Sequence, residues 1–259
     1  AFFFKYKNFM KKIILVALIT SFGFAQEVKR KLVWEENFNG TKLDETVWNY
    51  ELGNGCPNLC GWGNNELEYY RQENAEVRDG YLIIKAKQEN FGSRNYTSSR
   101  IKTQGKKSFT YGRIDVRAAL PKGQGIWPAI WMLGENITTV NWPACGEIDI
   151  MEHVGRDLNK VISAFHYPVY FGGNAKVATT MVPTATTEFH VYKLEWTPAS
   201  MQIFVDDKLF HTLPNSPSIP YNQNFFMILN IAMGGTLGGA IDPAFTSTTF
   251  EIDYVRVYQ

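Results

Sequence analysis

Three carboxylates crowd one short segment of the chain. Residues 142–155 read WPACGEIDIMEHVG and contain Glu147, Asp149 and Glu152. Side chains two positions apart share one face of a β-strand, so Glu147 and Asp149 point the same way. Strict alternation would turn Glu152 to the opposite face and put Met151 beside the two acids. One extra residue, a β-bulge, returns Glu152 to the acidic face, and bulges are common next to active sites.

Carboxylates on a shared face repel each other and raise at least one pKa, so one acid can stay protonated near neutral pH. A charged carboxylate beside a protonated one is the pair that glycoside hydrolysis uses. Two other interpretations stay open. Alternating acids also occur on solvated strand faces, and His153 and His166 are close enough in sequence to suggest a metal cluster. Because His153 directly follows Glu152, the two would face opposite ways, which argues against the metal.

Short alternating segments dominate the rest of the chain and are dense in β-branched and aromatic residues. We expect strands at LVWEENF, GYLIIKAKQ, GRIDVRAAL, EIDIME, VISAFHY, HVYKLEWTP, MQIFVDDKLF, FFMILNIAM and FEIDYVRVY. No stretch keeps a helical apolar period for three turns, and no linker or repeat divides the chain. The pattern predicts one all-β domain, a sandwich of two sheets, with Trp34, Trp48 and Trp196 in its core.

The composition of the chain limits which molecules it is expected to bind and how its cysteines can pair. The 26 basic and 25 acidic residues leave a net charge of +1, which gives no long-range attraction to nucleic acid or an anionic membrane. Seven Trp and 13 Tyr in a near-neutral chain fit a neutral ligand or a β core. The odd count of cysteines excludes full internal pairing. Whether Cys56 and Cys60 bridge the CPNLC loop, or all three including Cys145 are free, stays open.

The N-terminal segment is predicted to be an export signal. Met10 and two lysines precede an apolar run over residues 13–24, and Gly23 and Ala25 have the small side chains that signal peptidase requires. The run is too short to cross a bilayer, and no cysteine follows it that could carry a lipid. We therefore expect residues 1–25 to be upstream residues and signal peptide, and residues 26–259 to form a single secreted catalytic domain.

The acidic motif resembles glycoside hydrolase family 16, whose signature is Glu, aliphatic, Asp, aliphatic, an optional Met, and Glu. The likeness extends over nearly the whole predicted mature chain, through WEENFNG, GWGNNELEYY, DGYLIIKAK, YGRIDVRAALPKGQGIWPAIWML, SAFHY, FHVYKLEWTP, ILNIAMGG and IDYVRVY. It implies a β-jelly-roll sandwich of two antiparallel sheets with a concave substrate cleft. It also implies a retaining double displacement, with Glu147 as nucleophile, Glu152 as general acid/base and Asp149 hydrogen-bonded to Glu147.

The form of the motif that carries Met151 is similar to the laminarinase branch of that family. That resemblance implies an endo-acting, monomeric hydrolase of 1,3-β-glucan, with mixed-linkage 1,3-1,4-β-glucan as a second substrate. Agarases and carrageenases share this form, so a red-algal galactan stays an alternative. A non-catalytic β-glucan-binding sandwich is the alternative from another class, although such relatives typically lose the catalytic glutamates.

The resemblance also implies the residues that hold the substrate. Trp127, Trp131 and Trp142 would line the glycone side of the cleft, since sugar rings pack on indole. Trp127 and Trp131 share a face of an extended segment, and Pro128 between them predicts an edge or a distorted strand. Further polar cleft residues would be Asn65, Glu66, Arg100 and His166.

A structural calcium on the convex face is the one cofactor that the resemblance implies. Its ligands would be the carbonyl oxygens of Asn37 and Gly80 and the carboxylate of Asp253, and oxygen-only ligation suits calcium. Asn37 stands where an acid is frequent in laminarinases, which would weaken the site. No catalytic cofactor is expected.

Overall fold

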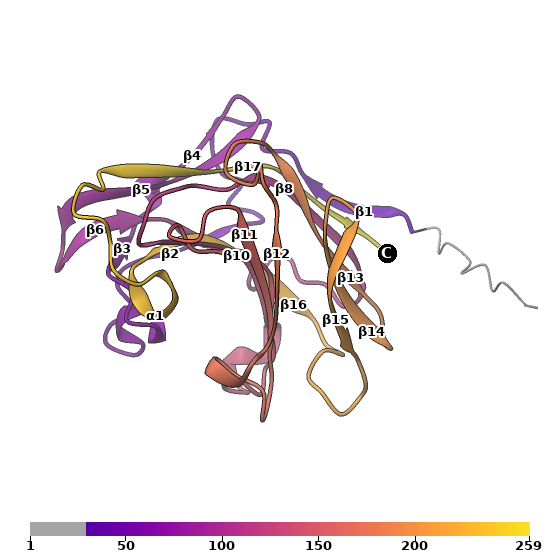
Figure 1. Ribbon diagram of the computed structural model, residues 1–259. Coiled ribbons are helices and arrows are strands. Elements are labelled where there is room, and N and C mark those ends of the chain that lie inside the picture. The colour runs from indigo at the N-terminus through magenta and orange to yellow at the C-terminus, as the bar shows by residue number, and fades with distance from the viewer. Residues whose placement is uncertain (1–29) are drawn as a thin grey trace, which may run out of the picture.

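The computed structural model describes residues 30–259, so the predicted signal peptide and the start of the mature chain lie outside the described residues. These residues form two curved β layers packed face to face (Figure 1). The only α-helix among them, α1 (Gly235–Gly238), has four residues, and no helix in the described part is long and apolar enough to cross a membrane.

One layer has ten strands in the order β15-β14-β13-β8-β17-β5-β6-β3, with β1 paired to β17 and β4 to β5. Its strands are β1 (Leu32–Glu36), β3 (Glu68–Tyr70), β4 (Ala75–Arg78), β5 (Tyr81–Phe91), β6 (Arg94–Ser98), β8 (Gly112–Ala119), β13 (His190–Trp196), β14 (Ser200–Val205), β15 (Lys208–Pro214) and β17 (Ser247–Tyr258). The sandwich agrees with expectation, but one pair departs from it: β3 runs parallel to β6.

The other layer has seven strands in the order β12-β11-β10-β9-β16-β7-β2. They are β2 (Asn49–Glu51), β7 (Arg100–Lys102), β9 (Ile126–Gly134), β10 (Glu147–His153), β11 (Lys160–His166), β12 (Lys176–Met181) and β16 (Phe225–Met233). Short 3-10 turns occupy Cys60–Gly63, Gln72–Asn74, Glu135–Thr138 and Gly172–Asn174. The strand that carries the three acids therefore lies inside this layer, between β9 and β11.

The core fills the space between the layers with the inward side chains of both. Trp48 and Trp196 are fully buried as predicted, and Trp34 packs against the same cluster from a partly exposed position. Of the cysteines, Cys56 and Cys60 form a disulfide, while Cys145 is free and buried. The disulfide closes the loop just before Trp62.

One prediction about an individual strand was wrong, and another was right in part. MQIFVDDKLF is a hairpin, because Asp206 and Asp207 both adopt positive φ and turn the chain between β14 and β15. Strand β9 is interior and not an edge strand, but its pairing with β10 is irregular close to Pro128, in line with the alternative of a distorted strand. The β9–β10 ladder ends at Ala129, so only β16 is in register with Pro128, and the missing N–H leaves no gap in a second ladder.

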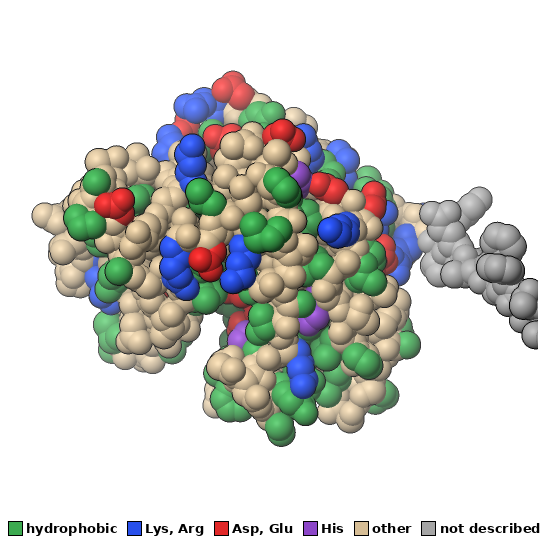
Figure 2. All heavy atoms as spheres, in the orientation of Figure 1, with side chains coloured by type: hydrophobic (Ala, Val, Ile, Leu, Met, Phe, Trp, Pro, Cys, Tyr) green, Lys and Arg blue, Asp and Glu red, His purple; other side chains and the backbone are tan. Residues whose placement is uncertain are grey.

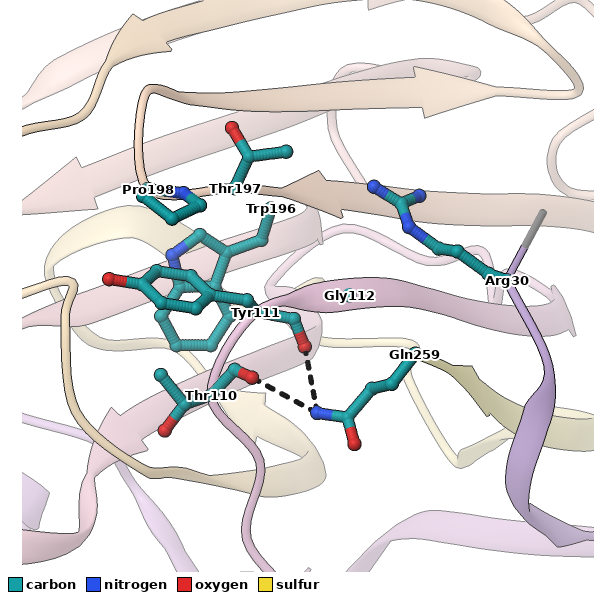
Figure 3. Close-up of a pocket in the computed structure, with 8 residues that line it drawn as sticks. All are labelled: Arg30, Thr110, Tyr111, Gly112, Trp196, Thr197, Pro198 and Gln259. Carbon is teal, nitrogen blue, oxygen red and sulfur yellow. Dashed lines mark hydrogen bonds between the residues drawn. The ribbon is translucent and has the colours of Figure 1, made fainter. Parts of the chain in front are cut away.

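A shallow hollow lies beside the ten-stranded layer, between Gln259 and Arg30, the first of the described residues (Figure 3). The Gln259 side chain donates hydrogen bonds to the carbonyls of Thr110 and Tyr111, at 3.0 and 3.2 Å, and the remaining lining comes from Arg30, Gly112, Trp196, Thr197 and Pro198. None of these residues belongs to the seven-stranded layer. This hollow is therefore separate from the acidic strand.

Candidate active site

The acidic strand β10 is bulged at the position that the alternation argument requires. Against β11, Asp149 pairs with Ala164 and Glu152 with Ile162, so three steps along β10 match two along β11. Met151 is fully buried in the core between the layers. Because Met151 takes the extra position, Glu152 returns to the face of Asp149, and the predicted bulge is confirmed.

Burial raises the pKa of all three carboxyl groups, and the charge of a neighbouring carboxylate adds to this for Glu147 and Asp149. Burial, followed by the charge of Asp149, raises the pKa of Glu147 to about 8. Burial and the charge of Glu152 raise the pKa of Asp149 well above its ordinary value, and burial raises that of Glu152. Protons in such a cluster belong to the group rather than to one residue. The cluster therefore retains at least one proton near neutral pH, as acid catalysis requires.

Trp127 holds the Glu152 carboxyl in place. Its indole Nε1 donates a hydrogen bond of 2.9 Å to Oε1 of Glu152. A donor of this kind favours the charged carboxylate, so it opposes the effect of burial on the pKa of Glu152.

Replacing Trp127 by phenylalanine should therefore raise the pKa of Glu152. An acid/base must be protonated to assist departure of the leaving group, so a higher pKa keeps it active to higher pH. We expect the alkaline limb of the kcat/KM profile to move up by about 0.5–1 pH unit. The control is Trp131→Phe, the same chemical change at an indole that bonds to Asn230 and not to Glu152. An unmoved limb in Trp127→Phe would contradict the role given to this hydrogen bond.

His166 lies beside the acids, whereas His153 does not. The Gly172 amide donates a 3.1 Å hydrogen bond to Nδ1 of His166, which leaves the ring hydrogen on Nε2. That Nε2 lies 3.2 Å from Oδ2 of Asp149 and 3.7 Å from Oε1 of Glu147. His153 is fully buried, and its Nδ1 lies 2.9 Å from the Lys160 carbonyl. The two histidines therefore do not form a joint metal site.

On the β9 side of the acids, aromatic rings hold a buried arginine. The Arg100 guanidinium lies 4.8 Å from the ring centres of both Trp62 and Trp131, and its Nε is 2.5 Å from Oε2 of Glu51. The Trp131 indole donates a 2.8 Å hydrogen bond to Asn230. Trp131 and Asp149 stand directly opposite each other in the β9–β10 ladder. This group is therefore contiguous with the acids.

Trp142 lies on the β11 side of the acids instead. Its ring centre is 5.9 Å from that of His166 and 5.4 Å from that of Phe171, and 41% of its surface is exposed. The structure thus does not bring the three predicted tryptophans to one side of the acidic strand: Trp131 lies toward β16 and β7, and Trp142 toward β11. The Trp142 side chain also hydrogen-bonds to Glu147, which lowers the pKa of that carboxyl group. Figure 2 shows acidic and histidine side chains at the wall of the hollow that indents the lower edge of the molecule.

The predicted residues Asn65 and Glu66 are adjacent in sequence but differ in setting. Asn65 is exposed in a turn with φ of 58°, and no hydrogen bond of its side chain is found within the described residues. Glu66 is 3% exposed and accepts hydrogen bonds from Asn64 and Tyr70, at 3.1 and 3.0 Å. Glu66 is therefore a fixed carboxyl group, and Asn65 a turn residue.

Sequence reasoning missed several residues of this region. Trp62 and Glu51 contact Arg100, as described above, and Asn230 is a buried amide within β16. The one polar side chain in FFMILNIAM was a signal that could have identified Asn230, because buried polar groups need partners. The Tyr221 hydroxyl lies 3.0 Å from the backbone carbonyls of both Glu147 and His166. It gave no signal in the sequence, since the residue is far from β10 along the chain.

The residues predicted to bind calcium lie on or next to strands that meet at β17, near the point where its register with β8 is irregular. Glu36 pairs with Val255 and Leu82 with Ile252, so the chain after β1 and the turn before β5 both approach Asp253. The Asp253 carboxylate already lies 2.5 Å from the Arg117 guanidinium. Among the described residues, the one acidic cluster with metal-like spacing is Glu147, Asp149 and His166, whose ligand atoms lie within 4.8 Å of one another.

Comparison with known proteins agrees with this geometry. The chain is 45% identical over 248 residues to a β-glucanase of Rhodothermus marinus, covering 88% of this chain and 85% of that one. It superposes on a laminarinase of Flavobacterium sp. UMI-01 with a TM-score of 0.84 at 49% identity, covering 88% and 100%. For the laminarinase catalytic domain of Thermotoga petrophila the TM-score is 0.86 at 41% identity, covering 89% and 98%.

These superpositions confirm the predicted jelly-roll sandwich. The family description "Glycosyl hydrolases family 16" matches residues 64–256, which include the acidic strand, Trp127, Trp131 and Trp142. The chain belongs to glycosyl hydrolase family 16.

Proposed function

We propose that this chain is an endo-acting 1,3-β-glucanase that cleaves laminarin-type glucan, with mixed-linkage 1,3-1,4-β-glucan as a second substrate. The observation that carries the proposal is the bulge of β10, which gathers Glu147, Asp149 and Glu152 on one face. Aromatic groups on both sides of that strand suit a neutral polysaccharide that passes across it. The names of the Rhodothermus and Flavobacterium relatives support the choice of β-glucan.

The proposed reaction is a double displacement with retention. Glu147 attacks the anomeric carbon while Glu152 protonates the departing glycosidic oxygen, which leaves a covalent glycosyl-enzyme. Glu152, now a carboxylate, then takes a proton from water, and the resulting hydroxide displaces Glu147. Because the pKa of Glu147 is raised to about 8, the attacking form needs a neighbour that can accept its proton. Asp149 is that neighbour, since it lies within hydrogen-bonding reach of Glu147.

Substrate choice is tested by parallel assays of reducing ends on laminarin, mixed-linkage glucan and agarose. We expect rapid release of short oligosaccharides from laminarin, slower release from mixed-linkage glucan and none from agarose. Release of internal fragments at early times distinguishes an endo mode from exo cleavage. Binding of laminarin without any new reducing ends would instead support a non-catalytic glucan-binding protein, and cleavage of agarose alone would support a galactan hydrolase.

The second part of the proposal concerns secretion of the protein, removal of its signal peptide and its oligomeric state. The predicted N-terminal signal supports secretion, and we propose that residues 26–259 work outside the cell as a monomeric catalytic domain. Mass spectrometry of protein recovered from the medium should give a mature chain that starts near Gln26. A chain that stays inside the cell with residues 1–25 attached would contradict export.

We further propose a structural calcium held by the Asn37 and Gly80 carbonyls and the Asp253 carboxylate. The pairing of both β1 and β5 with β17 supports this choice of ligands. The ion would have to share Asp253 with Arg117. Binding to the folded state alone stabilises it by about 2.7 kcal/mol at one hundred times Kd. We expect calcium to raise Tm by several degrees over EGTA, and magnesium to have no such effect. An equal calcium effect in Asp253→Ala would place the ion elsewhere.

A further inference from the structure

A pair of buried carboxyl groups lies outside the acidic strand: Glu66 just before β3, and Glu68 at the start of that strand. Glu66, Glu68 and Tyr70 alternate along this segment, so their side chains share one face. All three are buried: Glu66 is 3% exposed, and Glu68 and Tyr70 have no exposed surface. Two carboxyl groups on one buried face are costly if both are charged, because neither water nor distance separates them.

The hydrogen-bond partners of the two groups are unequal. Both oxygens of Glu66 accept a hydrogen bond, Oε1 from Asn64 and Oε2 from Tyr70. Oε2 of Glu68 accepts a 2.6 Å hydrogen bond from the Met233 amide. Oε1 of Glu68 is buried and has no donor among residues 30–259. A buried carboxylate oxygen without a donor is rare, whereas a carboxylic acid O–H needs an acceptor instead.

Glu66 supplies that acceptor. Glu68 lies within hydrogen-bonding reach of the Glu66 carboxyl. Burial, and after it the charge of Glu66, raise the pKa of Glu68 well above its ordinary value. A proton on Oε1 of Glu68 therefore removes the like-charge repulsion and satisfies the orphaned atom in one step.

The pair is connected to the substrate-facing side of the sheet. The Tyr70 hydroxyl, which donates to Glu66, also accepts a 3.0 Å hydrogen bond from the Asn230 amide. The Asn230 carbonyl in turn accepts the hydrogen bond of the Trp131 indole. Because an indole N–H can only donate, the bonds run in one direction from Trp131 to Glu66, and the chain requires Glu66 as its final acceptor.

We propose that Glu68 is a positioning residue that remains a neutral carboxylic acid, donates a hydrogen bond to Glu66, and so fixes Glu66 and the Tyr70–Asn230–Trp131 chain for glucan binding. It touches no substrate itself. The identity of the ligand rests on the proposed function, but the protonation state of Glu68 does not.

Two substitutions of Glu68 test whether its side chain acts as a neutral hydrogen-bond donor or as a charged carboxylate. Glu68→Gln keeps an oxygen for the Met233 amide and offers an N–H to Glu66, so it copies the neutral acid. Glu68→Met has similar length and offers neither. We expect KM for laminarin to stay within about twofold of wild type in Glu68→Gln and to rise about tenfold in Glu68→Met. The kcat should change little in both, because Glu147 and Glu152 are untouched. A Glu68→Gln variant as impaired as Glu68→Met, or two unimpaired variants, would overturn the proposal.

A spectroscopic measurement tests the protonation state without substrate. The infrared difference spectrum of wild type minus Glu68→Gln at neutral pH should contain the C=O band of a protonated carboxylic acid. A carboxylate band in its place would overturn the proposal even if the kinetic results were as expected. The infrared measurement needs only the wild type and Glu68→Gln, so it can be made even if Glu68→Met fails to fold. It also distinguishes a wrong account of Glu68 from a wrong choice of substrate.

Discussion

Glu147→Ser is expected to abolish hydrolysis of laminarin while binding of laminarin oligosaccharides persists. Serine removes the carboxylate that forms the glycosyl-enzyme, and loss of a nucleophile lowers kcat by more than about 10⁴-fold. The side chain is small, so the aromatic groups on either side of β10 keep their positions. Reducing-sugar release measures the first effect and calorimetric titration the second. Full activity in this variant would refute the proposed mechanism.

The pH dependence of Tm shows whether a Glu147 variant is correctly folded, because the raised pKa of Glu147 in the wild type links stability to pH. The pKa of Glu147 is raised from 4.5 to about 8 in the folded chain, so the folded state binds this proton more tightly than the unfolded state. The contribution to stability is therefore complete below pH 4.5 and is lost as pH rises toward 8. Glu147→Gln has no such proton to lose, and it should melt no lower than wild type at alkaline pH. A lower Tm there would show that inactivity reflects misfolding.

Glu152→Gln is expected to lower kcat on laminarin by about 10²- to 10⁴-fold, the usual contribution of a general acid. Glutamine keeps the acceptor for Trp127 Nε1 but cannot release a proton. The loss should shrink on an aryl glucoside whose leaving group departs without protonation, and steady-state kinetics on both substrates measures it. Equal losses on the two substrates would contradict the acid/base role.

Glu251→Gln is the matched control for the same chemical change. Glu251 lies on β17 of the ten-stranded layer, away from the acidic strand. It should retain laminarin hydrolysis close to that of wild type. A loss comparable to that of Glu152→Gln would show that the assay responds to general damage.

The alternation of side chains predicted the central feature of the site. Counting by twos from Glu147 required a bulge for Glu152 to join the acids, and the ladder between β10 and β11 has that bulge. The long strands were also predictable, because their apolar patterns are local. The hairpin within MQIFVDDKLF was not predicted, because an Asp-Asp turn between two strands of similar composition leaves the pattern unbroken.

What the sequence could not supply is long-range pairing. Strands β2 and β7 have three residues each, too few for a periodic signal, yet their pairing sets Glu51 opposite Arg100. The different surroundings of Trp131 and Trp142 depend on partners from other segments, Asn230 for Trp131 and Phe171 for Trp142. The unequal partners of Glu66 and Glu68 depend on a backbone amide of Met233, which is 165 residues away from Glu68 along the chain.

The position of Arg100 between two indoles has a thermodynamic consequence for the binding of a polymer. A free arginine side chain loses up to about 2 kcal/mol of rotamer entropy when a ligand immobilises it. Here Trp62, Trp131 and Glu51 hold the guanidinium already, so that loss is incurred during folding. The Trp131 ring is likewise fixed by Asn230. Most of the conformational entropy lost on binding is therefore lost by the flexible glucan. The protein surface on this side is already rigid before the glucan binds.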